Sequence, residues 1–421
     1  MSQPIPLSER TLYFSGVSEH FQAVAAAYRA FGQPAEALPL TTRDSLSLGM
    51  QASRGRECLY FVIQLGDLLA KSKQPNFDPE RSAMWSPDIS TKCVSVNFST
   101  RHRQIFAEHG LGALTTVTPL ASNNYAGFGE KYHKIADLSW SGIVAVDLLH
   151  QLQQSIRPYE LTRGAADAAY REGLTRVVAA AETGSIKNIG RALAAAGADF
   201  QAIPQDRSKR RPRVVLIGEY LLYNEYLNLD LVRQMEAMGG EVEVNRYYKL
   251  FYGISLGKIE RAANLENKAA YDELAASDSH QRALEHRMVG YVKHLFTDRQ
   301  PYAAPREEMR RYLKPHYNPE IANGAIDWGE GLELVDHDNG HGVIQIVPFL
   351  CLGAIVSASL GTRVRHDVGG VPWMDMVFDA QGTTNIRTRL EAFMHQTAQF
   401  QRTGAVRRSP LVRTHPAVTA V

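Results

Sequence analysis

The residues of this chain best suited to metal chemistry are its three cysteines, Cys58, Cys93 and Cys351, each at or shortly before the start of a predicted helix. The partial positive charge and free N–H groups of a helix N-terminus favour the thiolate, which is the form of cysteine that binds metal. Because three is an odd number, at least one thiol stays outside any intramolecular disulfide. The pattern suggests a shared metal cluster, with burial as small hydrophobic side chains as the alternative.

Composition limits the classes of partner. The formal charge of +2, from 46 basic and 44 acidic residues, gives no global field that would attract nucleic acid. The first ten residues lack the apolar core of a secretory signal. The apolar stretch at 343–360 contains Gln345, Pro348, Cys351 and two serines, which favour a buried strand and helix over a membrane span. We expect a cytoplasmic protein that binds neither nucleic acid nor membrane, in a compartment where thiols stay reduced.

Strand-like apolar runs alternate with helical patterns, which is typical of βαβ units and a parallel sheet. The predicted fold class is α/β, with two or three Rossmann-like parallel-sheet domains and a helical connector. Strands are predicted at 11–14, 83–86, 114–119, 213–218, 241–244, 343–347 and 372–378. Helices are predicted at 20–31, 59–71, 98–109, 131–154, 162–196, 225–238, within 256–296, after Cys351, and at 385–400.

These elements predict four regions of the chain. An N-terminal α/β domain at 1–155 carries Cys58 and Cys93, a helical connector occupies 156–210, and a C-terminal α/β domain at 211–401 carries Cys351. A flexible tail follows at 402–421.

Parallel sheets collect ligands outside the carboxyl ends of their strands, where the following helices begin, so we expect the three cysteines to converge on one crevice. The sequence contains no Gly-x-x-x-x-Gly-Lys-Ser/Thr motif, so nucleotide chemistry is assigned to a partner.

Several short motifs follow one another between about residues 11 and 393, in the same order as the motifs of one protein family. Gly-Arg-Glu-Cys-Leu-Tyr-Phe at 55–61, followed by Leu-Gly-Asp at 65–67, resembles the first cysteine motif of the 2-hydroxyacyl-CoA dehydratase superfamily, in particular its branch related to the acyl-CoA dehydratase activases. The other motifs are Asn-Phe-Asp-Pro-Glu-Arg at 76–81, Cys93 with the helix after it, Arg-Pro-Tyr-Glu at 157–160 with Gly164, Ile-Gly-Glu-Tyr at 217–220 with Asn228 and Glu236, Pro-Phe-Leu-Cys at 348–351, and Arg-x-Arg-Leu-Glu at 387–391.

The resemblance implies a 4Fe-4S cluster held by the thiolates of Cys58, Cys93 and Cys351, with one iron left without a protein thiolate. In such dehydratases an ATP-hydrolysing activator supplies one electron, and a 2-hydroxyacyl-CoA thioester loses its hydroxyl group through a ketyl radical. The implied activity is that of a lyase or reductase component, and the implied partners are the activator and a second dehydratase-like subunit or a second copy of the chain. The residues beside each cysteine differ from the family pattern, so cluster binding transfers more directly than the substrate does.

Two carboxylates complete the candidate site. Glu57 adjoins Cys58 and could relay a proton or contact an open iron, although a helix dipole alone accounts for a carboxylate there. Glu219 directly follows a predicted strand, at the edge where sites form. His337 and His341 lie in a glycine-containing loop and resemble a metal site only superficially.

Three interpretations stay open at the level of sequence. The first is an iron–sulfur enzyme component that performs low-potential one-electron chemistry on a thioester or related small substrate. The second is an accessory electron relay, or a double-cubane cluster subunit, without a substrate site of its own. The third is a non-catalytic protein that binds zinc or no metal at all.

Overall fold

The computed structural model describes residues 5–86, 93–218, 220–313, 326–337, 340–353, 355–356, 359, 361, 370–379 and 385–403. The chain divides into two compact units, each assembled from separated segments. Unit 1 comprises Met1–His150, Asp167–Ala202 and Ser277–Lys293, and unit 2 comprises Gln151–Ala166, Ile203–Ala276 and His294–Val421.

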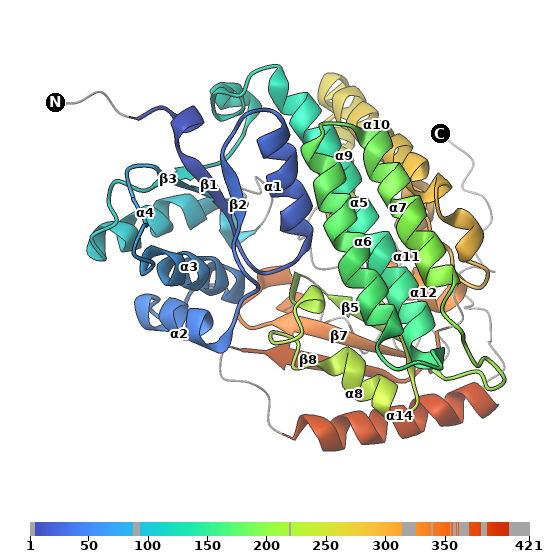
Figure 1. Cartoon of the computed structure of the whole chain (residues 1–421). Coiled ribbons are helices and arrows are strands. Elements are labelled where there is room, and N and C mark those ends of the chain that lie inside the picture. Colours follow the sequence, from blue (N-terminus) through green and yellow to red (C-terminus); the bar gives the residue numbers. More distant parts are fainter. Residues whose placement is uncertain are drawn as a thin grey trace. The chain divides into compact units, whose positions relative to one another are not determined.

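Unit 1 contains a four-stranded parallel sheet whose strand order is β2-β1-β3-β4 (Figure 1). The register pairs Leu12 with Ala35 on one side and with Ala83 on the other. The strands are β1 (Thr11–Phe14), β2 (Ala35–Ala37), β3 (Ser82–Trp85) and β4 (Thr115–Val117). The helices that connect them are α1 (His20–Ala30), α2 (Arg43–Ala52), α3 (Leu59–Ser72) and α4 (Phe98–Glu108).

The core of unit 1 lies on both faces of its sheet. Successive side chains of β1 and β3 point to opposite faces, because side chains alternate along a strand. Tyr13 and Met84 belong to a hydrophobic cluster with residues of α3 and α4. Phe14 and Trp85 contact aromatic rings on the other face, where α1 supplies Phe21. Helices α1 and α3 therefore cover opposite faces.

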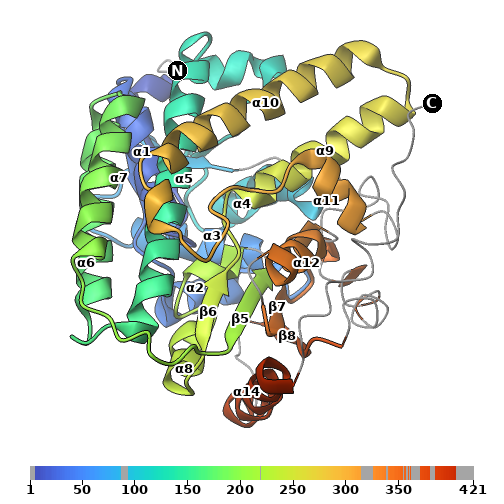
Figure 2. The same ribbon diagram turned by 90° about the vertical axis from the view of Figure 1, so that its right-hand side faces the viewer.

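Three further helices belong wholly or mainly to unit 1. They are α5 (Lys131–Ile156), α6 (Ala165–Glu182) and α7 (Ile186–Gln201), and Figure 2 shows α6 and α7 side by side. The sequence predicts one helix at 162–196, but the chain breaks at Gly184, whose φ of 71° is left-handed. The Ser185 side chain then accepts a hydrogen bond from the Asn188 amide and caps α7.

Helices α2 and α3 pack backbone to backbone at two glycines. A Cβ atom on Gly49 would lie 2.0 Å from the Val62 carbonyl oxygen, and one on Gly66 would lie 2.1 Å from the Ser45 carbonyl oxygen. Only glycine permits this approach. The N-terminus of α2 is fixed by a capping box between Thr42 and Ser45.

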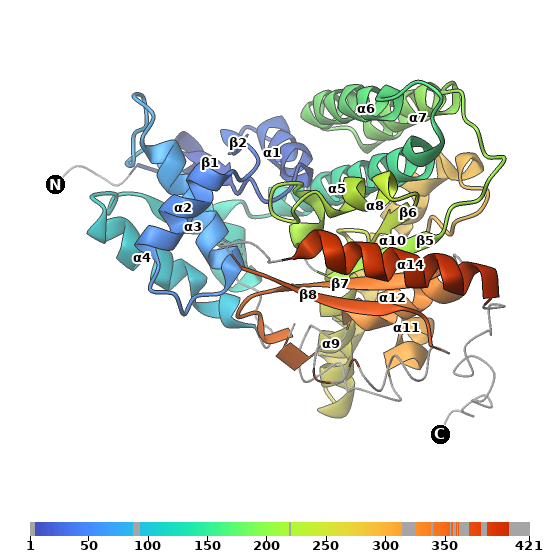
Figure 3. The same cartoon turned by 90° about the horizontal axis from the view of Figure 1, so that it is seen from below.

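Unit 2 contains a second four-stranded parallel sheet, whose order is β6-β5-β7-β8. Figure 3 shows α14 over one face of this sheet and α12 over the other. The strands are β5 (Arg213–Gly218), β6 (Glu241–Val244), β7 (Gly342–Pro348) and β8 (Trp373–Phe378). The principal helices are α8 (Leu231–Ala237), α9 (Lys249–Asn264), α10 (Lys268–Gly290, whose second half belongs to unit 1), α11 (Arg306–Leu313), α12 (Ile326–His337) and α14 (Ile386–Thr403).

The core of unit 2 joins its sheet to the helices on the α12 face. Val215, Val343 and Trp373 of the sheet lie in one cluster with Leu313 of α11 and Leu332 of α12. On the same side Lys249 of α9 and Glu333 of α12 form a fully buried ion pair, with Nζ 2.9 Å from Oε2.

Both sheets have the same strand order when numbered within their unit: second, first, third, fourth. In each, the chain reverses its direction across the sheet between the first and third strands, which is the topological switch point of an open parallel sheet. The predicted α/β fold class with parallel sheets is thus confirmed. The described ranges contain two such sheets. The sequence shows no obvious repeat, yet the topology repeats.

Most predicted elements lie within a few residues of those observed. The sequence missed β2, α2, α11 and α12. It overestimated α8, which is preceded by turns because Leu229 and Asp230 adopt left-handed φ values. In the part of the chain that the structure describes, no helix is long and apolar enough to cross a membrane.

Candidate functional site

Cys58 is the N-cap residue of α3 and is buried, with 8% of its surface exposed. Its carbonyl oxygen accepts the first helical hydrogen bond, from the Val62 amide at 3.3 Å. The side chain belongs to the cluster that contains Phe61 and Phe98, so α3 and α4 begin close to each other. The predicted position of Cys58 at a helix N-terminus is what the structure shows.

Glu57 connects the segment before α3 to α4. Its Oε2 accepts hydrogen bonds from the Arg54 and Arg56 amides at 2.9 and 3.1 Å, and its Oε1 lies 3.2 Å from Nη2 of Arg101. Burial raises the pKa of Glu57, but these donors outweigh it and hold the pKa below its usual value. The ionised carboxylate therefore positions the loop that carries Cys58.

Cys93 precedes a short 3₁₀ helix (Val94–Asn97) that continues directly into α4. The cysteine is partly exposed, and Val94 and Val96 beside it expose 45% and 46% of their surface. Cys93 thus lies in the connection between β3 and α4.

Cys351 follows β7 in unit 2 and is buried, with 6% exposed. Its amide donates to the Pro348 carbonyl oxygen at 3.1 Å, and its own carbonyl oxygen accepts from the Ile355 amide at 3.1 Å, the spacing of a helical turn. Phe349 and Ile355 are exposed apolar neighbours. Cys351 therefore also stands between the third strand of a sheet and a helical turn.

None of the three cysteines is in a disulfide. Cys58 and Cys93 belong to unit 1, whereas Cys351 belongs to unit 2. Within the described ranges, no group of three or more His, Cys, Asp or Glu side chains is gathered so as to hold a metal ion. The structure thus brings the starts of α3 and α4 together, and the complete ligand set stays a prediction.

The other candidates differ in how far the structure describes them. Glu219 lies outside the described residues, as does the side chain of His337. His341 is half-buried, and its Nδ1 accepts a hydrogen bond from the Arg213 amide at 3.0 Å. Burial and the neighbouring Arg213 lower the pKa of His341, which favours the neutral ring that accepts this hydrogen bond.

Sequence reasoning gave no role to Asp67 of α3, which lies at the carboxyl end of β1. Its Oδ2 accepts hydrogen bonds from the Ser15 hydroxyl, the Gly16 amide and the Thr41 hydroxyl at 2.9 to 3.0 Å, and its Oδ1 accepts from the Ser45 hydroxyl at 3.0 Å. Burial raises the pKa of Asp67 to about 6, although the four donors oppose this. The sequence signals were its place in the Leu-Gly-Asp motif at 65–67 and a carboxylate inside a mostly apolar helix.

Comparison with known proteins gives no further assignment. Neither the protein-family models nor the curated proteins contain a match to this chain.

Proposed function

We propose that this protein is a cytoplasmic iron–sulfur component resembling those of 2-hydroxyacyl-CoA dehydratases. In this proposal the thiolates of Cys58, Cys93 and Cys351 hold a 4Fe-4S cluster, and electrons come from an ATP-dependent activator. The substrate class is a 2-hydroxyacyl-CoA thioester or a related small molecule. A second dehydratase-like subunit or a second copy of the chain completes the assembly.

The observation that carries the proposal is the equivalent placement of two cysteines. Cys93 and Cys351 each follow the third strand of a four-stranded parallel sheet, and the two sheets have the same strand order. Cys58 caps α3, the helix that leads into the third strand of the first sheet. In each unit the chain thus leaves the third strand at its carboxyl end, beside the switch point where such folds bind their ligands, and then reaches a cysteine.

The donor set suits the group. Thiolates are the usual ligands of iron–sulfur clusters, and helix N-termini stabilise the anionic form that binds iron. A bound cluster would supply one-electron transfer and, at an iron without a protein thiolate, Lewis-acid chemistry. The chain's own contribution is to hold Cys58 in place through the hydrogen bonds of Glu57 to Arg54, Arg56 and Arg101.

Anaerobic purification with iron and acid-labile sulfide analysis tests the cluster. We expect about four irons and four sulfides per chain, and a large loss of both in Cys58→Ala, Cys93→Ala and Cys351→Ala. Ser99→Ala, in the first turn of α4, is the matched control and should retain the iron. A colourless wild-type protein without iron, whose stability does not change when the cysteines are replaced, would contradict the proposal.

A second experiment separates an enzyme from an electron relay. The iron-loaded protein is mixed with a dehydratase activator, ATP and a panel of 2-hydroxyacyl-CoA esters, and loss of the hydroxyl group is followed by mass spectrometry. Turnover supports the dehydratase assignment. Reduction of the cluster without turnover of any ester would assign the protein to electron relay instead.

A further inference from the structure

A separate set of polar side chains in unit 1 forms a hydrogen-bonded chain of three. The Ser18 hydroxyl lies 2.5 Å from Nδ1 of His20, and Nε2 of His20 lies 3.1 Å from Oδ1 of Asp147. All three residues are at most 2% exposed. His20 is the first residue of α1 and Ser18 lies in the turn before it, whereas Asp147 belongs to α5.

This order of groups is that of an activated nucleophile. With Asp147 ionised, Nε2 of His20 carries the hydrogen that the carboxylate accepts, so Nδ1 is left as the acceptor for the Ser18 hydroxyl hydrogen. A base that accepts a hydroxyl proton and is itself oriented by a carboxylate is the arrangement that makes a serine nucleophilic.

Ser18 lies in the turn between β1 and α1, at the carboxyl end of the strand. Gly16, Val17 and Ser18 match the first three positions of the Gly-x-Ser-x-Gly nucleophile turn, which also joins a strand to a helix. A Cβ atom on Gly16 would lie 1.8 Å from the Pro39 carbonyl oxygen, so the turn requires glycine. Among the described residues no acceptor contacts the amides of Ser18 and Glu19, which are the kind of donors that stabilise an oxyanion.

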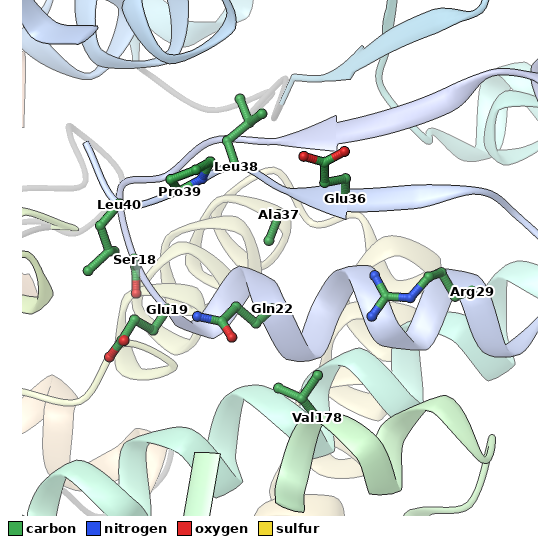
Figure 4. Close-up of a pocket in the computed structure, with 10 residues that line it drawn as sticks. All are labelled: Ser18, Glu19, Gln22, Arg29, Glu36, Ala37, Leu38, Pro39, Leu40 and Val178. Carbon is green, nitrogen blue, oxygen red and sulfur yellow. The ribbon is translucent and has the colours of Figure 1, made fainter. Parts of the chain in front are cut away.

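Ser18 also lines a cavity of about 330 Å³ in unit 1. Figure 4 shows Glu19, the N-cap residue of α1, and Gln22 of α1 on one side of it and the segment after β2 on the other. Five apolar residues line it, Ala37, Leu38, Pro39, Leu40 and Val178. The volume is at the small end of the range for ligand sites, about 300 to 1,000 Å³.

The charges around the cavity select among substrates. Glu36 is paired with Lys71 at 2.7 Å, and Arg29 is paired with Glu182. Glu19 accepts a hydrogen bond from the Tyr170 hydroxyl at 2.7 Å and has no cationic partner among the described residues. An anionic acyl group would be repelled by Glu19, whereas a neutral or cationic one is accepted.

We propose that Ser18 is the nucleophile of an acyl-transfer site for small neutral or cationic esters, with His20 as general base and Asp147 as the residue that orients it. The Ser18 Oγ bonds to the ester carbonyl carbon, while the hydroxyl proton passes to Nδ1 of His20. The carbon–oxygen bond to the alcohol breaks, and the alcohol leaves with that proton. Water then hydrolyses the acyl-serine by the same route, giving the carboxylic acid and free Ser18. This site does not depend on the cysteines.

Diisopropyl fluorophosphate, which reacts with activated serines, tests the assignment on the whole chain. Intact mass spectrometry of the wild type should show one diisopropylphosphoryl group per chain, and peptide mapping should place it on Ser18. We expect no label on Ser18→Ala and labelling of His20→Gln at least about 100-fold slower. Ser15→Ala, three residues away in the same turn, should be labelled at the wild-type rate, because the Ser15 hydroxyl bonds to Asp67 and not to His20.

The labelling of the wild type tests the proposal even if a variant fails to fold. An unlabelled wild type, or a label on another residue, overturns the proposal. Equal labelling rates for the wild type and a folded His20→Gln variant also overturn it, since the three residues would then only tie α1 to α5. Hydrolysis of p-nitrophenyl acetate that is lost in Ser18→Ala would support it independently.

Discussion

Asp67 gives the sharpest prediction, because its contribution to stability falls as the pH rises through its raised pKa. Burial raises its pKa from 3.8 to about 6, so the folded protein binds a proton more tightly than the unfolded chain does. The wild type should therefore lose stability as the pH rises from about 4 to about 6, and the loss should level off above that. A shift of about two pH units corresponds to about 3 kcal/mol of unfolding free energy.

Asp67→Asn removes this titration and keeps the shape of the side chain. The Asn oxygen can take the place of Oδ2 and accept from Ser15, Gly16 and Thr41, while its amide faces Ser45. The Ser45 hydroxyl already lies 3.2 Å from the Thr42 carbonyl oxygen and can donate there instead. Asp67→Ala leaves these buried donors without an acceptor, so it should destabilise unit 1 by about 3 kcal/mol or more at every pH.

The assay is urea unfolding of the wild type and both variants between pH 4 and pH 8, with hydrogen exchange of peptides from β1 and α3 to follow unit 1. We expect the difference between wild type and Asp67→Asn to change by about 3 kcal/mol over the window, in favour of the variant at higher pH. If the unfolding free energies of the wild type and Asp67→Asn changed equally between pH 4 and pH 7, the reasoning would be refuted, because Asp67 would then not titrate in that range.

Three other changes test the packing and the charges. Gly66→Ala should lower the free energy of unfolding by about 1 to 3 kcal/mol, measured by thermal unfolding, because the added Cβ would meet the Ser45 carbonyl oxygen. A variant as stable as the wild type would contradict the close approach of α2 and α3. Lys249→Met alone should cost about 3 to 5 kcal/mol by leaving Glu333 buried without its cation, and adding Glu333→Leu should recover most of this loss in the same assay. The lowered pKa of Glu57 means that its contribution is present above the usual glutamate pKa and is lost as the pH falls through the folded-state value. The hydrogen-exchange protection factors of the amides at 54–60 should therefore fall on acidification in the wild type and not in Glu57→Gln.

Local pattern was enough to predict seven of the eight strands in the described ranges and the helix start beside Cys58. The apolar runs of β1 and β5 were clear, and the start of α3 beside Cys58 followed from its apolar helix. It was not enough for β2, which has three residues, or for α2, whose close approach to α3 depends on Gly49 and Gly66. The pairing of His20 with Asp147 spans 127 residues, so no spacing in the sequence signals it.

The interleaved segments of unit 1 have a consequence for its synthesis on the ribosome. The four strands of its sheet have all been made once Val117 has emerged, but the segment Ser277–Lys293 follows much later. That segment supplies the Gln281 carbonyl oxygen to Nε1 of Trp140 at 3.0 Å and Nε2 of His280 to Asp137 at 2.9 Å. At about 5 to 20 residues per second, the nascent chain spends roughly 10 to 30 seconds with the first sheet formed and this helical segment still missing. The nascent chain therefore exposes the surface around Trp140 during translation, and a chaperone that binds it should do so in that interval.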